Sequence, residues 1–330
     1  MFIIAEAGIN HNGNISIAEK LIVEAANAGA DAIKFQAAIP SLVCIKKSPL
    51  AEYQKNNNYE DQFKLLSELH FPLEKYKYLR DFSLRKGIEF MCSAFDCESL
   101  DYIDNLGVSI HKIASGEITH YPFLKKIASY NKPTIVSTGM ATLNEVENCY
   151  KVLISNGLDS SNIIIMHCTT NYPTDFEDVN LLAIRTISEK FNCQIGYSDH
   201  TIGSEISIAA LALGCTYFEK HFTLDKNMEG PDHKASLSLL ELNDYIKKLR
   251  KVFLALGDGI KRPFGKEINN KLIVRRSIFA KKKIKKGDIF NEDNLICKRP
   301  SIGIDSMKWN SVIGQKALKD FNSDEPISLQ

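Results

Sequence analysis

The chain has 330 residues, with 41 Lys and Arg against 40 Asp and Glu, and a formal net charge of +1 at pH 7. Because the two signs are mixed along the chain, this balance argues against a protein that binds nucleic acid or a membrane surface. The length favours one large domain followed by a small one. The opening residues lack a basic leader and the eight cysteines form no Cys-x-x-Cys pair, so we expect a cytoplasmic protein with reduced thiols and no membrane span.

Short β-rich runs alternate with amphipathic helical patterns over the first three quarters of the chain. The predicted strands are 2–7, 32–36, 89–93, 109–114, 134–137, 163–168, 194–197 and 216–219. Helical patterns lie between them, and several end at a glycine, which is a common helix stop. Eight strand–helix units in about 250 residues favour a closed (β/α)8 barrel, a TIM barrel, over an open doubly wound sheet.

Two segments depart from this alternation. Residues 37–70 are polar and broken, and they are too many for an ordinary strand-to-helix loop, so we expect a substrate-side loop or lid. Residues 258–272 are basic and unpatterned, which predicts a linker between a barrel domain at 1–257 and a small domain at 273–330. The small domain has short β-like runs and turns. Because it is too short for a large core of its own, we expect it to pack on the barrel or on a second subunit.

Polar residues follow nearly every predicted strand, and in a barrel these positions share one pocket. They are Glu6, Lys34, Gln36, Ser93, Lys112, Ser115, Glu117, Ser137, Asn171, Tyr172, Ser198, His200, Glu219 and His221. Two lysines among hydroxyl and amide groups suit a phosphate or a phosphorylated acid. Glu117 and Glu219 lie beside cations, so each is either an ion-pair partner or a proton-transfer group.

His200 and His221 follow neighbouring predicted strands, in the segments 198–200 and 219–221. They are either two ligands of one metal ion, or one ligand and one hydrogen-bonded wall residue. Two imidazoles leave coordination positions for water or a substrate oxygen, which a Lewis-acid metal needs in order to polarise a carbonyl. Nitrogen and oxygen ligands without a thiolate suit Mn²⁺ or Mg²⁺ at least as well as Zn²⁺.

Eight motifs follow one another along nearly the whole chain: EAGINHNG at 6–13, KFQ at 34–36, KIASGE at 112–117, STGM at 137–140, HCTTNYPT at 167–174, SDHT at 198–201, EKHFT at 219–223 and GPDH at 230–233. Together they resemble the sialic acid synthase family. The tail from about Arg275 resembles that family's antifreeze-like (SAF, β-clip) domain, which is small and rich in β structure. The resemblance implies an enzyme that condenses phosphoenolpyruvate with the open-chain aldehyde of an N-acylated mannosamine. It would release phosphate and a nine-carbon 2-keto acid.

The resemblance also implies roles for residues at the matching positions. His200 and His221 would bind the Mn²⁺ or Mg²⁺ that polarises the sugar aldehyde. Phosphoenolpyruvate would be bound by Lys34, Ser93, Lys112, Ser115, Ser137, Asn171 and Ser198. The sugar would contact Glu6, Tyr172 and Asp232. Catalysis would involve Lys112, Glu117 and Glu219, with Glu117 as the acid/base that helps water add at C2 after C3 has attacked the aldehyde.

Arg299 resembles the residue that the family's small domain inserts into a partner's barrel, where it contacts the N-acyl group of the sugar. This implies a head-to-tail, domain-swapped homodimer. The family's usual Arg-Pro-Gly turn reads Arg299-Pro300-Ser301 here, so we expect this loop to be shaped differently. Ser93 stands where some relatives carry Thr, a change that keeps the hydroxyl.

The leading hypothesis for the reaction is an N-acetylneuraminate synthase that acts on N-acetylmannosamine. The alternative is an N,N'-diacetyllegionaminate synthase that acts on 2,4-diacetamido-2,4,6-trideoxymannose. The first is favoured by rim candidates that can bond the sugar's hydroxyls, namely Glu6, Tyr172, Asp232, His233 and the stretch 52–62. The second is favoured by apolar candidates for a methyl group, namely Ile39, Leu42 and Val43. A carbohydrate-binding or ice-binding protein with an inactive barrel is disfavoured by the full set of lysines, carboxylates and histidines.

Overall fold

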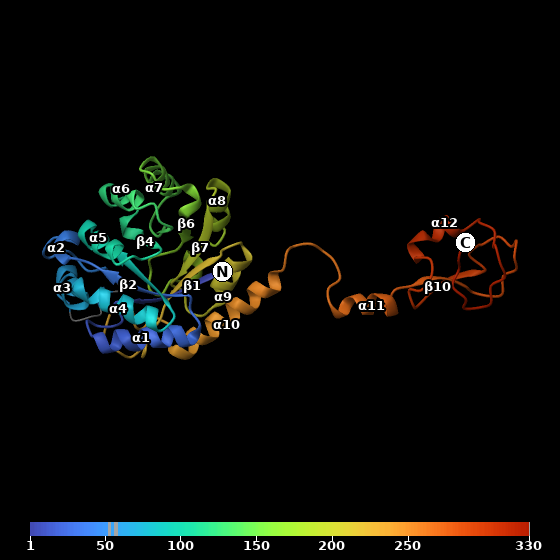
Figure 1. The fold of residues 1–330 in the computed structure, drawn as a ribbon, viewed down its shortest axis with the longest axis horizontal. Helices are drawn as coiled ribbons and strands as arrows, with labels where there is room; N and C mark the ends of the chain where they lie inside the picture. Colours follow the sequence, from blue (N-terminus) through green and yellow to red (C-terminus); the bar gives the residue numbers. More distant parts are fainter. Residues whose placement is uncertain (52–53, 56–58, 330) are drawn as a thin grey trace. The chain divides into compact units, whose positions relative to one another are not determined.

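The computed structural model describes residues 1–51, 54–55 and 59–329, and the chain divides into two compact units, Met1–Gly257 and Asp258–Gln330. In the first unit, eight parallel strands close into a barrel in the order β1-β2-β3-β4-β5-β6-β7-β8, and β8 pairs with β1. Helices surround this barrel (Figure 1). The predicted (β/α)8 barrel is confirmed, and the open doubly wound sheet is wrong.

The barrel strands are β1 (Phe2–Gly8), β2 (Ala32–Ala37), β3 (Glu89–Ala94), β4 (His111–Ile113), β5 (Thr134–Ser137), β6 (Ile163–His167), β7 (Gln194–Asp199) and β8 (Tyr217–His221). The helices around them are α1 (Ile15–Ala28), α4 (Glu74–Arg85), α5 (Cys97–Asn105), α6 (Tyr121–Ser129), α7 (Leu143–Ser155), α8 (Ala183–Lys190), α9 (Glu205–Ala212) and α10 (Leu239–Leu256). Strand β4 is shorter than predicted, because the chain bends before His111 and enters a 3₁₀ turn at Ser115–Glu117. In the described part of the chain, no helix is both long and apolar enough to cross a membrane.

The interior of the barrel changes from apolar to polar along the strands. Toward their amino ends, inward side chains form a buried apolar cluster of Ile4, Ala32, Met91, Ile135, Ile164 and Met166. Two residues further along four of these strands stand Glu6, Lys34, Ser93 and Ser137, which are also buried. Because side chains two apart on a strand share a face, both sets point inward. The apolar cluster is therefore the floor of a polar chamber at the carboxyl ends of the strands.

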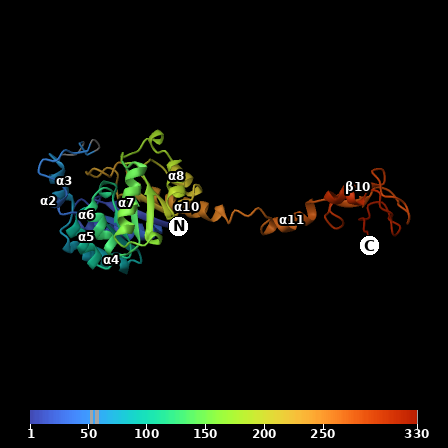
Figure 2. The same ribbon diagram turned by 90° about the horizontal axis from the view of Figure 1, so that it is seen from above.

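The long connection between β2 and α4, which we call the β2–α4 segment, contains two helices that the sequence pattern did not predict. They are α2 (Pro40–Val43) and α3 (Gln62–Leu69), which lie side by side at the edge of the barrel in Figures 1 and 2. Asp61 caps α3 by accepting a hydrogen bond from the backbone N–H of Lys64 at 2.8 Å. This helix buries only Leu65 and Leu69, so its apolar periodicity is too brief to stand out in the sequence.

The second unit contains α11 (Lys266–Val274), β9 (Ser277–Ala280), β10 (Leu295–Lys298) and the short α12 (Trp309–Val312). Strands β9 and β10 pair antiparallel over a small apolar core. The expectation of a β-rich SAF domain after the barrel is confirmed. Within the stretch 258–272, which the sequence predicted to be a linker, α11 begins at Lys266. Ile268 and Leu272 stand four residues apart on α11, but none of its residues is buried.

His11, in the loop between β1 and α1, makes the stability of the barrel depend on pH. Its ring is fully buried and stacks on Phe71, with ring centroids 4.1 Å apart. Its Nδ1 accepts a hydrogen bond from the backbone N–H of Gly13 at 3.1 Å. Burial lowers the pKa of His11 from 6.5 to about 3, and the nearby His70 adds to this effect. The folded state therefore holds the neutral ring.

His11 should leave stability unchanged above pH 6.5 and should destabilise the barrel as the pH falls from 6.5 toward 3, because only the unfolded chain takes up the proton readily. The expected loss is about 1.4 kcal/mol per pH unit. His11→Asn keeps an acceptor for the backbone N–H of Gly13 but does not titrate. In this variant, the free energy of unfolding should therefore lose about 1.4 kcal/mol per pH unit less than in the wild type. Urea unfolding followed by circular dichroism, from about pH 5 to 7.5, measures this. Equal slopes for the two proteins below pH 6 would contradict it, and above pH 7 the two curves should run parallel.

Candidate active site

A cavity of about 810 Å³ lies at the carboxyl ends of the barrel strands. Most of the site residues predicted from the sequence line it, and they come from all eight strands or the loops that follow them. They are Glu6, Lys34, Ser93, Lys112, Ser115, Ser137, Asn171, Tyr172, Ser198, His200, Glu219, His221 and Asp232. The two predicted site residues that do not line it are Glu117 and Arg299.

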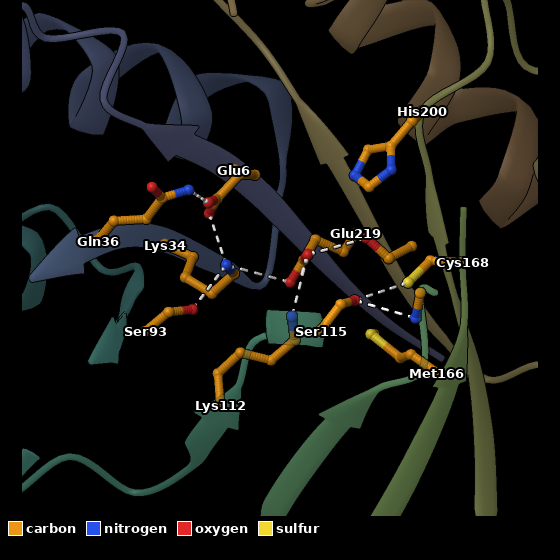
Figure 3. Close-up of polar contacts among 12 residues, drawn as sticks. Glu6, Lys34, Gln36, Ser93, Lys112, Ser115, Met166, Cys168, His200 and Glu219 are labelled. Atoms are coloured by element: carbon orange, nitrogen blue, oxygen red, sulfur yellow. Dashed lines mark hydrogen bonds and ion pairs between the residues drawn. The ribbon is translucent and has the colours of Figure 1, made fainter. Parts of the chain in front are cut away.

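Figure 3 shows the Lys34 side chain between two carboxylates. Its Nζ lies 3.0 Å from Oε2 of Glu6 and 3.5 Å from Oε2 of Glu219. The same nitrogen donates a hydrogen bond to Oγ of Ser93 at 3.0 Å. Gln36, on the same face of β2 as Lys34, donates to the second carboxylate oxygen of Glu6 at 2.9 Å. Three buried charges thus lie in direct contact, which is the arrangement that buried ionised groups require.

Glu219 connects the two lysines of this cluster. Its Oε1 accepts from Nζ of Lys112 at 3.2 Å and from Oγ of Ser198 at 3.0 Å. Burial alone would raise the pKa of Glu219, but Lys112 and Lys34 hold it well below its ordinary value. Burial raises the pKa of Glu6 from 4.5 to about 7, against the opposing effect of Lys34. The base of the cavity therefore has two cations, one ionised carboxylate and one carboxyl group that can gain a proton near neutral pH, which suits an anionic ligand.

A polar wall beside this cluster is formed by the ends of β4, β5 and β6. Ser115 Oγ accepts from the backbone N–H of Gly139 at 3.0 Å and lies 3.3 Å from Sγ of Cys168. A Cβ atom at position 139 would lie 2.5 Å from Cγ2 of Thr170, so only glycine fits there. Oγ of Ser137 is buried without a hydrogen-bond partner among the described residues. This hydroxyl is therefore available to a ligand.

His200 and His221 face the cavity from the ends of β7 and β8. Nδ1 of His200 donates a hydrogen bond to the carbonyl oxygen of Thr169, which leaves Nε2 with its lone pair. The ring of Tyr172 lies 4.1 Å from that of His200 and 5.7 Å, edge-on, from that of His221. Burial lowers the pKa of His200 to about 4 and the pKa of His221 well below 6.5. Both rings are therefore neutral, which is the form that binds metal ions.

These two imidazoles fit a divalent metal ion. Their centroids are 5.7 Å apart, and a metal–nitrogen bond of about 2 Å lets one ion reach both rings. Nδ1 of His221 is buried and has no hydrogen-bond partner among the described residues, and Oδ2 of Asp232 lies 3.9 Å from it. The described residues contain no group of three or more His, Cys, Asp or Glu that could hold a metal. Water or substrate would therefore complete the coordination, as in an open site.

Glu117 was expected in the pocket, but its Oε2 lies 2.7 Å from Nδ1 of His120, and it is not among the lining residues. The 3₁₀ turn at Ser115–Glu117 leaves Ser115 at the cavity and turns Glu117 away from it. Arg299 directly follows β10 in the second unit, where it lines a small cleft with Arg276 and Lys298. The chemical roles expected for Glu117 and Arg299 stay predictions.

The β2–α4 segment, which the sequence predicted to lie on the substrate side, contributes a wall to the cavity. Its lining residues are Val43, Ala51, Gln54, Gln62, Leu65, Leu66 and His70. Ile9 and Phe95, from loops after β1 and β3, complete an apolar surface there. The signal that could have revealed this wall is the amphipathic pattern of α3, whose Leu65 and Leu69 pack with Ile9. Val43 and the stretch 52–62 were named from the sequence, but Leu65, Leu66 and His70 were not, because no strand fixes the direction of their side chains.

The rim candidates named for the sugar divide in the structure. Of the apolar candidates at 39–43, only Val43 lines the cavity, and Leu42 is 49% exposed. His233 was expected at the rim, but it is fully buried and bonds the hydroxyl of Thr223 at 2.7 Å. From the polar stretch 52–62, Gln54 and Gln62 line the cavity, while 52–53 and 56–58 lie outside the described residues.

Comparisons with known proteins agree on one family. The NeuB family matches residues 21–261 and the SAF domain matches 275–330. The chain is 48% identical to the N,N'-diacetyllegionaminic acid synthase of Campylobacter jejuni, over 98% of both proteins. It is 40% identical to the synthase of that name from Legionella pneumophila, over 98% of this chain and 92% of the relative. The crystal structure of an N-acetylneuraminic acid synthetase from Leptospira borgpetersenii, in complex with citrate, matches at 34% identity and a TM-score of 0.72, over 82% of this chain and 89% of that one.

The fold and its cationic cavity define a TIM-barrel enzyme that carries an SAF domain after the barrel. The chain belongs to the NeuB family, whose members make sialic acid and related nonulosonic acids. The resemblance that the eight motifs indicated is thus confirmed. The two curated relatives described above are both named as synthases of N,N'-diacetyllegionaminic acid, and both match nearly the whole chain.

Proposed function

We propose that this protein is an N,N'-diacetyllegionaminate synthase, which condenses phosphoenolpyruvate with 2,4-diacetamido-2,4,6-trideoxymannose and releases phosphate. The observation that carries the proposal is the 48% identity to a synthase of that name over 98% of both chains. The sequence alone favoured N-acetylmannosamine because of polar residues expected at the rim. One of these, His233, is buried away from the cavity. The apolar wall of Ile9, Val43, Leu65 and Leu66 supports the alternative, because the 6-methyl and the second acetyl group need apolar surface.

The cationic base of the cavity is proposed to bind phosphoenolpyruvate. Lys34 and Lys112 would neutralise its phosphate and carboxylate charges, and the hydroxyl of Ser137 would donate to one of its oxygens. Glu219 holds both ammonium groups in place before the ligand arrives, so little reorganisation is needed on binding. The remaining proposed contacts are Ser93, Ser115, Asn171 and Ser198, which all line the cavity.

His200 and His221 are proposed to hold Mn²⁺ or Mg²⁺. When bound, such an ion supplies a Lewis acid for the aldehyde oxygen of the sugar. The chain contributes two neutral imidazoles, and Thr169 fixes the tautomer of the first. The ring of Tyr172 packs against that ring, tilted by 37°, and limits its rotation.

Proton transfer is proposed to involve carboxyl groups whose pKa burial has raised. Glu6 has a pKa of about 7 and Asp232 a pKa of about 6, so both can bond the sugar as acid or base near neutral pH. Glu219 stays ionised and balances the lysines. C3 of the enolpyruvate attacks the aldehyde carbon, water adds at C2 and phosphate leaves. A role for Glu117 in the addition of water requires its carboxylate to leave His120 and reach the cavity.

The choice of sugar gives the first test of this function. We expect kcat/KM for the diacetamido sugar to exceed that for N-acetylmannosamine by more than about a hundredfold, roughly 2.7 kcal/mol, at saturating phosphoenolpyruvate. The reason is that the 6-methyl and the second acetyl group would both gain apolar contact with this wall, whereas N-acetylmannosamine offers neither group. Leu66→Gln places a polar group on that wall and should narrow the ratio, whereas Leu240→Gln, at a side chain 85% exposed on α10, should not. A preference for N-acetylmannosamine would instead identify the protein as an N-acetylneuraminate synthase.

Removal of the metal gives a second test. A chelator should abolish turnover and Mn²⁺ should restore it, because the proposed Lewis acid activates the aldehyde. His221→Ala should lower kcat/KM by roughly a thousandfold or more while the far-ultraviolet circular dichroism stays that of the folded barrel. The assay is phosphate release, measured at saturating phosphoenolpyruvate while the sugar concentration is varied. Full activity in protein that metal analysis shows to be stripped would refute the metal assignment.

The second unit is proposed to pair with the barrel of a second copy of this chain. Within its own unit, α11 leaves Ile268 51% exposed and Leu272 57% exposed, which is surface that a partner could cover. Arg299 is then proposed to contact the N-acyl group of the sugar in the partner's cavity. Such an exchange makes a two-fold homodimer in which each site needs both chains.

Mixing two inactive variants tests this exchange. Arg299→Ala and His221→Ala should each be nearly inactive alone. After subunit exchange, about a quarter of wild-type activity should return, because half of the dimers are mixed and each has one intact site. The matched control mixes His221→Ala with Lys112→Met. Both substitutions lie in the barrel, so no dimer has an intact barrel and no activity should return. No recovery in the first mixture, with exchange confirmed by native mass spectrometry, would place the action of Arg299 in its own chain or nowhere.

A further inference from the structure

Two charged residues lie between the site residues of β7 and β8 and have no part in the proposed mechanism. In the segments 198–200 and 219–221, the first and third residues line the cavity. The middle residues, Asp199 and Lys220, are 1% and 2% exposed and do not line it, because alternate side chains of a strand point to opposite faces. They are register partners across the two strands.

Asp199 and Lys220 form a buried ion pair at the outer face of the barrel. Nζ of Lys220 lies 2.8 Å from Oδ2 of Asp199 and donates to the carbonyl oxygen of Thr201 at 2.7 Å. Oδ1 of Asp199 accepts from the backbone N–H of Thr201 at 2.9 Å and from its hydroxyl at 2.7 Å. The pair therefore also fixes the residue that follows His200.

Two helices complete the surroundings of this pair. Ser207 on α9 donates to Oδ2 of Asp199 at 2.6 Å, and its hydroxyl lies 2.8 Å from that of Tyr245 on α10. Nζ of Lys220 lies 5.7 Å from the centroid of the Tyr245 ring. The pair thus joins two strands and two helices at the level where His200 and His221 enter the cavity.

Stability alone is a weak reason for such a pair, because well-packed apolar residues of the same volume often stabilise a buried position as well or better. What an ion pair adds is directional, since its hydrogen bonds fix the relative position of the groups that carry them. Each partner here is flanked by two side chains of the cavity, which are Ser198 and His200 on β7, and Glu219 and His221 on β8.

We propose that Asp199 and Lys220 are positioning residues, which hold the ends of β7 and β8 so that the metal and phosphoenolpyruvate meet a preformed site. The inference rests on the proposed function, because it concerns the ligands of that same cavity. Groups that hydrogen-bond metal ligands affect metal affinity about 10- to 100-fold, and this pair, which holds the strand ends that carry the ligands, should act at the lower end of that range. The pair acts from the outer face and touches neither ligand.

Asp104 on α5, a half-buried acid with two basic partners, provides a control outside the cavity. Oδ1 of Asp104 lies 2.9 Å from Nε2 of His111 and 2.6 Å from Nζ of Lys132. His111 begins β4 and Lys132 precedes β5, so these contacts lie at the amino ends of strands. Breaking them should lower the melting temperature without disturbing the cavity.

The experiment uses the full chain and measures three quantities. They are the Kd for Mn²⁺ by electron paramagnetic resonance titration, the Kd for phosphoenolpyruvate by calorimetry, and the melting temperature. Asp199→Asn and Lys220→Met should each raise the Kd for Mn²⁺ by about tenfold or more and also raise that for phosphoenolpyruvate. The double variant leaves no unpaired buried charge, so it should regain much of the melting temperature while both Kd values stay raised. If the single variants do not fold, the two Kd values of the double variant alone test the proposal. Asp104→Asn should lower the melting temperature and leave both Kd values within about twofold.

A double variant that binds both ligands as the wild type does would overturn the inference, and so would an Asp104→Asn variant that weakens binding as much as Asp199→Asn. If the wild-type chain binds phosphoenolpyruvate but no Mn²⁺, the metal part of the proposed function fails and the phosphoenolpyruvate Kd alone decides the inference. A wild-type chain that binds neither ligand would overturn the proposed function and this inference together.

Discussion

Closure of the barrel is the constraint on which the site depends. The pairing of β8 with β1 sets Glu6 opposite His221 and completes the ring of inward side chains. Only then does Glu219, on the last strand, reach Lys34 on the second and Lys112 on the fourth. An open sheet of the same strands would leave these charges at separate edges, where burial without a partner would cost several kcal/mol each.

The closed barrel places apolar packing and charged groups at opposite ends of its strands. Its apolar floor, which includes Ile4 and Met91, provides close packing at the amino ends. The carboxyl ends hold ionised groups in a fixed arrangement, and they are stable there because Lys34 and Lys112 both contact Glu219. The same contacts hold the cations ready for an anionic substrate. The packing of the floor and the chemistry of the chamber therefore follow from one alternating pattern.

The part of the cavity that faces the sugar has a different origin from the part that faces the phosphate. The cationic base comes from strands, where each side chain's direction is fixed by alternation. The apolar wall comes from the β2–α4 segment, through Val43, Leu65 and Leu66. Such a division lets a shared barrel keep one reaction while a connecting segment changes the substrate, as is common in barrel enzymes. The proposed preference for a deoxy, diacetamido sugar depends on this segment.

The sequence by itself determined the eight strands, the inward set from Glu6 to His221 and the family, because strand period and strand-end motifs are local properties of the chain. Prediction from the sequence was weakest in the segments that lack such a period. The helix α3 shows only two buried residues, α11 shows none, and the turn that carries Glu117 onto His120 leaves no mark in the sequence. The distances among Lys34, Glu219 and Lys112, and the pairing of Asp199 with Lys220, were decided by the tertiary structure alone. They join residues on different strands, and their separation in space is set by barrel closure and register, which no local pattern encodes.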